Sequence, residues 1–224
     1  MALERVLEPE VMDTVKEAQD YDSMDHSLVN EIFVQDLLAT GPIEGEVLDV
    51  GTGTAQIPIE LCKHTEDCRI SAVDLSINML ELARYNIEVN SVIQRVYLQH
   101  MDAKELPYDS EIFDVVMSNS IIHHIPNPMD CLEEAVRVCS SGGLIFFRDL
   151  MRPENDDQVR RLVYLHAGGE NEHQQQMFED SLRAALSLEE IQALVAELGC
   201  DPMTVEATSD RHWTWAVRMV ENDE

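Results

Sequence analysis

The sequence predicts an α/β fold built on a doubly wound, mostly parallel sheet. Short apolar runs alternate with stretches of helical spacing from about Glu46 to Leu150, which is the pattern of repeated strand–helix units. In the stretch Val47 to Gln56, VLDVGTGTAQ, a strand-like run passes into a glycine-rich turn and then into a helix expected from about Ala55 to His64. Such a turn suits a nucleotide-like cofactor, because the following helix points free N–H groups and its positive dipole end at the ligand.

The glycine spacing of this turn argues against a dinucleotide. A dinucleotide site requires G-x-G-x-x-G, and here Gln56 occupies the position of the third glycine after Gly51 and Gly53. Asp49 stands two residues before Gly51, where its carboxylate would crowd a pyrophosphate but can pair with an ammonium group. We therefore expect a cofactor without phosphates.

At this turn the chain resembles the class I S-adenosylmethionine (SAM) dependent methyltransferases, whose first motif is acid-x-Gly-x-Gly-x-Gly. Ala55 departs from that motif, because it stands where the last glycine is usual. The resemblance implies a Rossmann-like, seven-stranded sheet with an antiparallel last strand, SAM as the cofactor and S-adenosylhomocysteine as the product. The cofactor contacts that it implies in the turn are Asp49, Gly51, Thr52, Gly53, Thr54 and Gln56.

A second strand-like run, Arg69 to Leu75, ends in the acid Asp74. In a doubly wound sheet an acid at this strand end faces the cofactor ribose and can accept hydrogen bonds from both hydroxyls. Ser76 is expected to cap the next helix. Leu75 and Met79 are then placed near the adenine, although plain core packing explains Met79 equally well.

Two further strand ends extend the cofactor prediction. Asp102-Ala103 follows the run Val96 to His100 and resembles the family position that accepts a bond from the adenine amino group. Asn119, near the end of the run Phe113 to Ser120, would line the methyl-donor pocket mainly through backbone atoms. Each acid alone reads as a turn or cap aspartate, but three acids at successive strand ends favour a cofactor site.

The loop Ile121 to Pro128, IIHHIPNP, carries two candidate catalytic residues. Its pattern is similar to that of the ubiquinone/menaquinone-biosynthesis C-methyltransferases and their small-molecule relatives. His123 and His124 can exchange protons near neutral pH. The alternative is a solvated turn or a polar wall of the pocket, since transfer from a sulfonium depends chiefly on positioning.

Arg148 is the third candidate catalytic residue, at the end of the strand-like run Gly143 to Leu150. Together with Arg152 it predicts an anionic small substrate, because guanidinium groups bind carboxylate or phosphate in bidentate fashion. A structural ion pair between Arg148 and Asp149 is the competing interpretation.

The domain prediction has an N-terminal helical cap over residues 1–42 and a methyltransferase domain over residues 43–224. Cap helices are expected near Glu10 to Gln19 and Asp25 to Leu38, and a helical insertion at about 154–185 would cover the substrate pocket. Within it His166 and His173 lack a metal-ligand spacing, so we expect no metal. Met203 to Thr208 and His212 to Met219 are expected as closing strands.

Composition narrows the function classes. The chain has 44 acidic and 15 basic residues and a net charge of −29, which argues against nucleic acid and anionic lipid as partners. No apolar run approaches the length of a membrane span, and the amino terminus lacks a signal pattern, so we expect a cytoplasmic protein without membrane insertion. Five cysteines without a C-x-x-C pair argue against a disulfide framework.

The predicted function is SAM-dependent methyl transfer to a small molecule, with the acceptor atom (O, N, S or C) and the oligomeric state left open. A quinone-ring C-methyltransferase is one alternative. Alternatives of other classes are an enzyme of this fold that does not methylate and a SAM-binding protein without catalysis.

Overall fold

A computed structural model describes residues 3–8, 14–24 and 26–220. The chain divides into two compact units, which we describe separately. The histidine unit comprises Met1–Glu10, Ser120–Met129 and Arg148–Ala216. The glycine-turn unit comprises Val11–Asn119, Asp130–Phe147 and Val217–Glu224.

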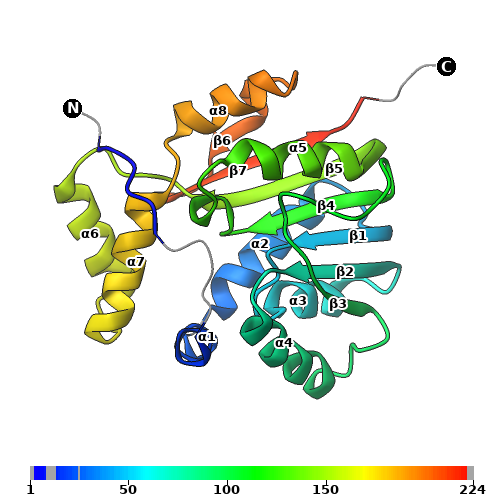
Figure 1. Ribbon diagram of the computed structural model, residues 1–224, viewed down its shortest axis with the longest axis horizontal. Helices are drawn as coiled ribbons and strands as arrows, with labels where there is room; N and C mark the ends of the chain where they lie inside the picture. The colour runs from blue at the N-terminus through cyan, green and yellow to red at the C-terminus, as the bar shows by residue number, and fades with distance from the viewer. Residues whose placement is uncertain (1–2, 9–13, 25, 221–224) are drawn as a thin grey trace. The chain divides into compact units, whose positions relative to one another are not determined.

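The sheet has seven strands in the order β3-β2-β1-β4-β5-β7-β6 (Figure 1). β1 pairs in parallel with both β2 and β4, β2 pairs in parallel with β3, and β6 and β7 are antiparallel. The strands are β1 (Gly45–Val50), β2 (Cys68–Asp74), β3 (Val96–His100), β4 (Phe113–Asn119), β5 (Cys139–Leu150), β6 (Val205–Ala207) and β7 (His212–Arg218). This topology confirms the predicted doubly wound sheet with an antiparallel last strand, and its order reverses beside β1, where such sheets bind ligands.

The helices of the glycine-turn unit follow the predicted pattern. α3 (Gln56–His64) comes directly after the glycine turn, and α4 (Ile77–Val89) begins at the cap Ser76, whose hydroxyl accepts a bond from the Met79 N–H. The last four residues of β1 are all buried, and three of them, Val47, Leu48 and Val50, are apolar. α5 (Pro128–Val138) starts at a proline that we had predicted to lie in a loop, because proline suits the first turn of a helix.

Two helices precede the sheet in sequence. They are α1 (Val15–Ser23) and α2 (Ser27–Ala39), close to the predicted pair. The predicted helix starts, Glu10 and Asp25, lie outside the described residues. α1 contacts α4, and α2 contacts α3.

Helices also occupy the predicted insertion in the histidine unit. α6 (Asp156–Ala167) and α7 (Glu172–Ala184) pack together, and the Asn171 side chain caps α7. Between them Gly168 ends α6, where an added Cβ would come within 2.3 Å of the Tyr164 carbonyl oxygen. A small hydrophobic core joins α6 and α7 to the end of β5. Its buried residues are Leu150, Leu162, Leu182 and Ala185.

The C-terminal part confirms one capping prediction and corrects one strand. Ser187 and Glu190 form the predicted capping box of α8 (Leu188–Glu197). The predicted strand from Met203 begins only at Val205, because Pro202 and the Asp201 side chain hold the 3₁₀ turn η2 (Pro202–Thr204). Trp213 and Trp215 of β7 are fully buried, as expected for core residues.

Candidate active site

The turn between β1 and α3 has an unusual backbone. Gly51 and Gly53 have φ angles of 73° and 54°, and Ala55 has a φ of 60°. All three lie in the left-handed region, where glycine carries no steric penalty and alanine does. Ala55 thus adopts the conformation for which the family motif uses glycine.

Four backbone N–H groups of this turn are already bonded. Those of Gly51 and Thr52 both donate to the Val73 carbonyl at 2.9 Å, and that of Ala55 donates to the Thr52 carbonyl at 2.9 Å. The N–H of Gly53 donates to Asp74 Oδ2 at 2.7 Å. A phosphate cradle needs such N–H groups free, so the geometry agrees with the absence of a dinucleotide fingerprint.

Four buried side-chain oxygens near the carboxyl ends of β1 and β4 have no hydrogen-bond partner among the residues that the structure describes. They are Asp49 Oδ2, Thr52 Oγ1, Thr54 Oγ1 and Asn119 Oδ1. A buried polar group without a partner costs free energy, and a ligand that supplies the partner recovers that cost.

Burial dominates the electrostatics of Asp49. It raises the pKa of this carboxyl from 3.8 to about 7, with the charge of Asp74 adding to the shift. A cationic ligand group beside Oδ2 would reverse the shift, because an opposite charge favours the ionised form. The position therefore suits an ammonium group.

Asp74 holds the glycine turn against the start of α4. Its Oδ2 accepts the Gly53 N–H, and its Oδ1 accepts the Ser76 N–H at 2.8 Å. Burial raises the pKa of Asp74, although these backbone bonds oppose the shift. Each oxygen keeps a lone pair that a ligand hydroxyl can use.

The residues predicted around the adenine lie in different environments. Asp102 accepts bonds from the backbone N–H and the ammonium group of Lys104, both at 2.9 Å. Partial burial opposes ionisation of Asp102, but Lys104 holds its pKa below the ordinary value. Met79 and Ala103 are buried, whereas Leu75 is half-buried.

Three side chains that the sequence did not single out, Asp22, Asn30 and Asn86, support the turn together with Gln56. Gln56 donates to Asp22 Oδ1 at 3.2 Å and accepts from Asn30 at 3.0 Å. Asn86 of α4 donates to the same Asp22 oxygen and to the Thr54 carbonyl, each at 3.1 Å. These bonds connect α1 and α2 to the glycine turn.

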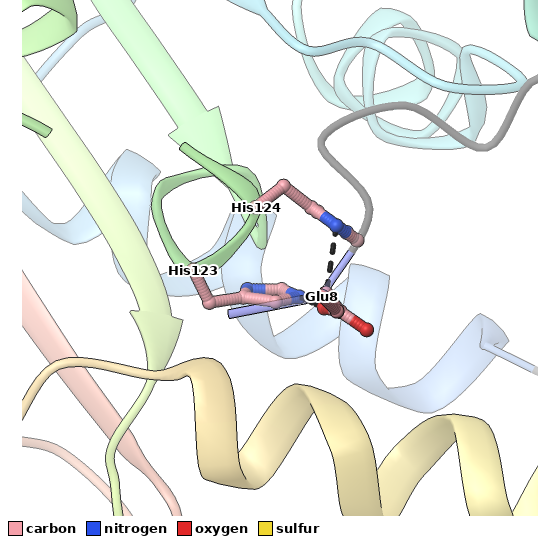
Figure 2. Close-up of side chains that lie close together, drawn as sticks. All are labelled: Glu8, His123 and His124. Carbon is pink, nitrogen blue, oxygen red and sulfur yellow. Dashed lines mark ion pairs between the residues drawn. The ribbon is translucent and has the colours of Figure 1, made fainter. Parts of the chain in front are cut away.

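The predicted catalytic histidines lie in the histidine unit, on η1 (Ile122–His124), where they face Glu8 (Figure 2). His123 Nδ1 is 2.6 Å from Asp149 Oδ1, and His123 Nε2 is 3.4 Å from Glu8 Oε1. His124 Nδ1 is 3.2 Å from the same Glu8 oxygen. Only 3% of His123 is exposed, so it is a buried group rather than a solvated turn residue.

Burial and neighbouring charges act in opposite directions on the pKa values of His123 and Asp149. Burial disfavours a charged His123 ring, but Asp149 and Glu8 outweigh burial and raise its pKa. Burial likewise opposes ionisation of Asp149, yet His123 and two backbone N–H groups lower its pKa. Burial raises the pKa of Glu8.

The two arginines both make contacts within the fold. Arg148 is buried and donates to Thr214 Oγ1 at 2.9 Å. Arg152 donates to the Ala185 carbonyl at 2.7 Å and to Glu190 at 2.5 Å. The anionic substrate inferred from these arginines stays a prediction.

The sequence analysis did not identify Glu8, and it considered Asp149 only as the partner of Arg148 in a structural ion pair. Glu8 carries no sequence signal, because it meets the histidines only through the fold. Asp149 could have been found, since it is another acid near the carboxyl end of a strand, where Asp74 also lies.

Comparison with known proteins agrees with this geometry. The family model described as "Methyltransferase domain" matches residues 48–147, which include the glycine turn, Asp74 and both histidines. Over these residues, which make up less than half of the chain, the chain is similar to the class I SAM-dependent methyltransferases.

Two curated relatives are methyltransferases. One is 27-O-demethylrifamycin SV methyltransferase of Amycolatopsis mediterranei, 28% identical over 78% of this chain and 62% of the relative. The other is demethylmenaquinone methyltransferase of Porphyromonas gingivalis, 31% identical over 48% of this chain and 44% of the relative. The chain thus spans about half the length of the curated relatives it matches.

Solved structures support the fold. One is a SAM-dependent methyltransferase of Methanococcus maripaludis, described as putative in its title, with a TM-score of 0.71, 17% identity and coverage of 97% of this chain and 99% of that one. The plantazolicin methyltransferase in complex with S-adenosylhomocysteine also has a TM-score of 0.71, with 16% identity and coverage of 90% and 88%. At these identities the likeness concerns the fold alone.

Proposed function

We propose that this protein is a methyltransferase that transfers the methyl group of SAM to a small-molecule acceptor and releases S-adenosylhomocysteine. The observation that carries the proposal is the buried Oδ2 of Asp49, which has no hydrogen-bond partner among the described residues, beside a turn in which the N–H groups of Gly51, Thr52 and Gly53 are already bonded. Such a site offers a carboxylate to a cation and is poorly suited to a phosphate. The ammonium group of the SAM amino acid supplies that cation.

The cofactor contacts are assigned residue by residue. Asp49 takes the ammonium, and the glycine turn allows close approach of the amino acid part. Asp74 takes the ribose hydroxyls with its remaining lone pairs, while Asp102 takes the adenine amino group. The supporting contacts are Gly51, Thr52, Gly53, Thr54, Gln56, Leu75, Met79, Ala103 and Asn119.

Positioning is the main catalytic contribution of the chain. The bound cofactor supplies an electrophilic methyl group on a sulfonium, so an acceptor held about 3 Å from that carbon and in line with the sulfur needs little further activation. Acid–base roles for His123 and His124 stay predictions, since His123 is already held between two carboxylates.

The acceptor is a small molecule, and its reacting atom is open. The match to demethylmenaquinone methyltransferase keeps a quinone-ring C-methyltransferase as the alternative. The net charge of −29 argues against a nucleic-acid acceptor. In the described part of the chain no helix is long and apolar enough to cross a bilayer, and a cytoplasmic location is part of this proposal.

Calorimetric titration with SAM and S-adenosylhomocysteine tests the cofactor site. A methyl-transfer screen of acids, phenols, hydroquinones, amines and thiols follows on the same sample. Binding of both ligands together with methylation of an acceptor supports the proposal. Binding without methylation of any acceptor favours the non-methylating or non-catalytic alternatives, and absence of binding overturns the cofactor assignment.

A further inference from the structure

Three side chains of the histidine unit converge on one point outside the glycine turn. Figure 2 shows the rings of His123 and His124 facing the carboxylate of Glu8. Both ring nitrogens approach the same oxygen, Glu8 Oε1, at 3.4 Å and 3.2 Å. The three candidate ligand atoms all lie within 4.8 Å of one another.

The two distances from the histidine nitrogens to Glu8 Oε1 are close to ligand–ligand distances around a metal ion. Ligand atoms about 2.0–2.1 Å from a tetrahedral zinc stand roughly 3.3–3.4 Å apart. The 3.4 Å between His123 and Glu8 is also long for an N–H···O bond, whereas the 2.6 Å between His123 and Asp149 is short. The two carboxylates therefore play different roles toward the same ring.

Asp149 fixes which nitrogen of His123 carries a proton. With Nδ1–H donating to Asp149, Nε2 is the ring nitrogen that faces Glu8. Either a proton or a metal ion on Nε2 can join this nitrogen to the Glu8 carboxylate. A proton is bonded to only one ring nitrogen, whereas a metal ion can be bound by both histidines and by Glu8 at once.

The surrounding residues hold the ligands in place. Asp149 Oδ2 accepts the backbone N–H of His123, and Ser181 donates to Glu8 Oε1 at 3.2 Å. Carboxylates and hydroxyls bonded to metal ligands in this way orient them and tune the site.

Arg5 anchors the segment that carries Glu8. Its guanidinium donates to the carbonyls of Ala184 at 2.6 Å, Ile125 at 3.0 Å and His123 at 3.2 Å. This cation bonds to backbone oxygens and leaves the Glu8 carboxylate to the histidines. The site is thus assembled before any ion arrives.

We propose that Glu8, His123 and His124 bind a divalent first-row transition-metal ion, with zinc as the reference. Two imidazoles and one carboxylate suit such ions, whereas magnesium and calcium prefer oxygen ligands. Three protein ligands leave one coordination position for water or for an oxygen of a bound molecule.

The test is calorimetric titration of chelator-treated, tag-free protein with zinc, repeated with cobalt to read its visible absorption. We expect one ion per chain and the absorption of a low-symmetry nitrogen–oxygen site. His124→Ala and Glu8→Gln should each weaken zinc binding by at least about tenfold.

His64→Ala is the matched control, because His64 pairs with Glu60 at 3.2 Å on α3 but has no second histidine in that pair. It should leave the affinity unchanged. Wild type binding zinc no better than His124→Ala and Glu8→Gln would overturn the proposal and leave the cluster as an ion pair.

If circular dichroism shows that His124→Ala or Glu8→Gln does not fold, Ser181→Ala provides a second test. It removes only the bond to Glu8, and we expect a loss of about tenfold or more in zinc affinity. Unchanged affinity in this folded variant would count against the site. SAM titrated on the same samples reports the glycine turn separately, so failure of one proposal is distinguishable from failure of the other.

Discussion

The two units each contain one buried polar centre, and the centres are built in opposite ways. In the glycine-turn unit, oxygens of Asp49 and Asn119 lie buried without a protein partner. In the histidine unit, His123 lies between the carboxylates of Asp149 and Glu8. The first centre leaves its polar atoms to a ligand, whereas the second satisfies much of its polar requirement within the chain.

This difference has an energetic consequence. An unpartnered buried carboxylate lowers the stability of the empty protein, and removing its charge should raise that stability. A paired buried group contributes to the fold, and removing one partner should lower stability. Substitutions in the two units should therefore shift the free energy of unfolding in opposite directions.

The largest expected effect is Asp149→Ala in the histidine unit. The substitution leaves His123 Nδ1 and the backbone N–H groups of His123 and Leu150 without their acceptor. We expect a loss of about 3–5 kcal/mol in the free energy of unfolding, measured by chemical denaturation. Asp210→Ala, at the exposed pair with His166, is the control and should cost less than about 1 kcal/mol. An equal loss in the free energy of unfolding of both variants would show that the buried pair of Asp149 and His123 stabilises the protein no more than the exposed pair.

Asp49→Asn should shift stability the other way. The folded pKa of Asp49, about 7, lies above its ordinary value of 3.8, so ionisation opposes folding. This cost is absent below about pH 4, grows between pH 4 and pH 7, and is constant above. At pH 8 the variant should be more stable by up to about 4 kcal/mol, with a smaller gain at pH 5. Thermal unfolding at both pH values measures this.

The same variant should bind SAM more weakly, because it loses the carboxylate that pairs with the ammonium. Calorimetric titration beside the unfolding experiment checks the sign of both changes. A variant that loses stability and keeps its affinity would show that Asp49 is a structural residue.

Asp74→Asn tests the next contact. We expect SAM binding to weaken by roughly 1–3 kcal/mol through loss of charge-assisted bonds to the ribose. The control is Asp67→Asn, an exposed acid just before the opposite end of β2, which should leave the affinity unchanged. Equal SAM affinities of the wild type and the Asp74→Asn variant would show that Asp74 does not contact the cofactor.

Ala55→Gly should have the smallest effect. Ala55 has a φ of 60°, so glycine relieves a left-handed alanine but also gains freedom in the unfolded chain. We expect stability to change by no more than about 1 kcal/mol, with SAM affinity retained. A larger loss in thermal unfolding would mean that the methyl group packs in the turn.

Local patterns predicted the fold and the glycine turn well. Strand β3 begins and ends at the predicted residues, and the caps Ser76 and Ser187 accept the expected bonds. These features depend on neighbours in sequence. The strand predicted from Met203 was wrong at its start, because Asp201 and Pro202 favour a 3₁₀ turn there.

Contacts between distant segments could not be predicted in this way. Nothing near Glu8 in the sequence indicates that it meets His123 and His124, and Lys104 gives no sign that it engages Asp102. Metal-ligand spacing rules do not detect the proposed site of Glu8, His123 and His124 for the same reason, since they detect ligands on one helix or loop. A site whose residues come from several distant segments can be recognised only once the fold is known.

The placement of the two tryptophans determines what optical measurements can report. Trp213 and Trp215 are the only tryptophans of the sequence, and both lie fully buried on β7 within the histidine unit. Intrinsic fluorescence therefore follows the environment of that one strand. Separation of β7 from its surroundings shifts this emission. Comparing the emission with a whole-chain signal during unfolding would show whether the two units lose their structure together or in succession.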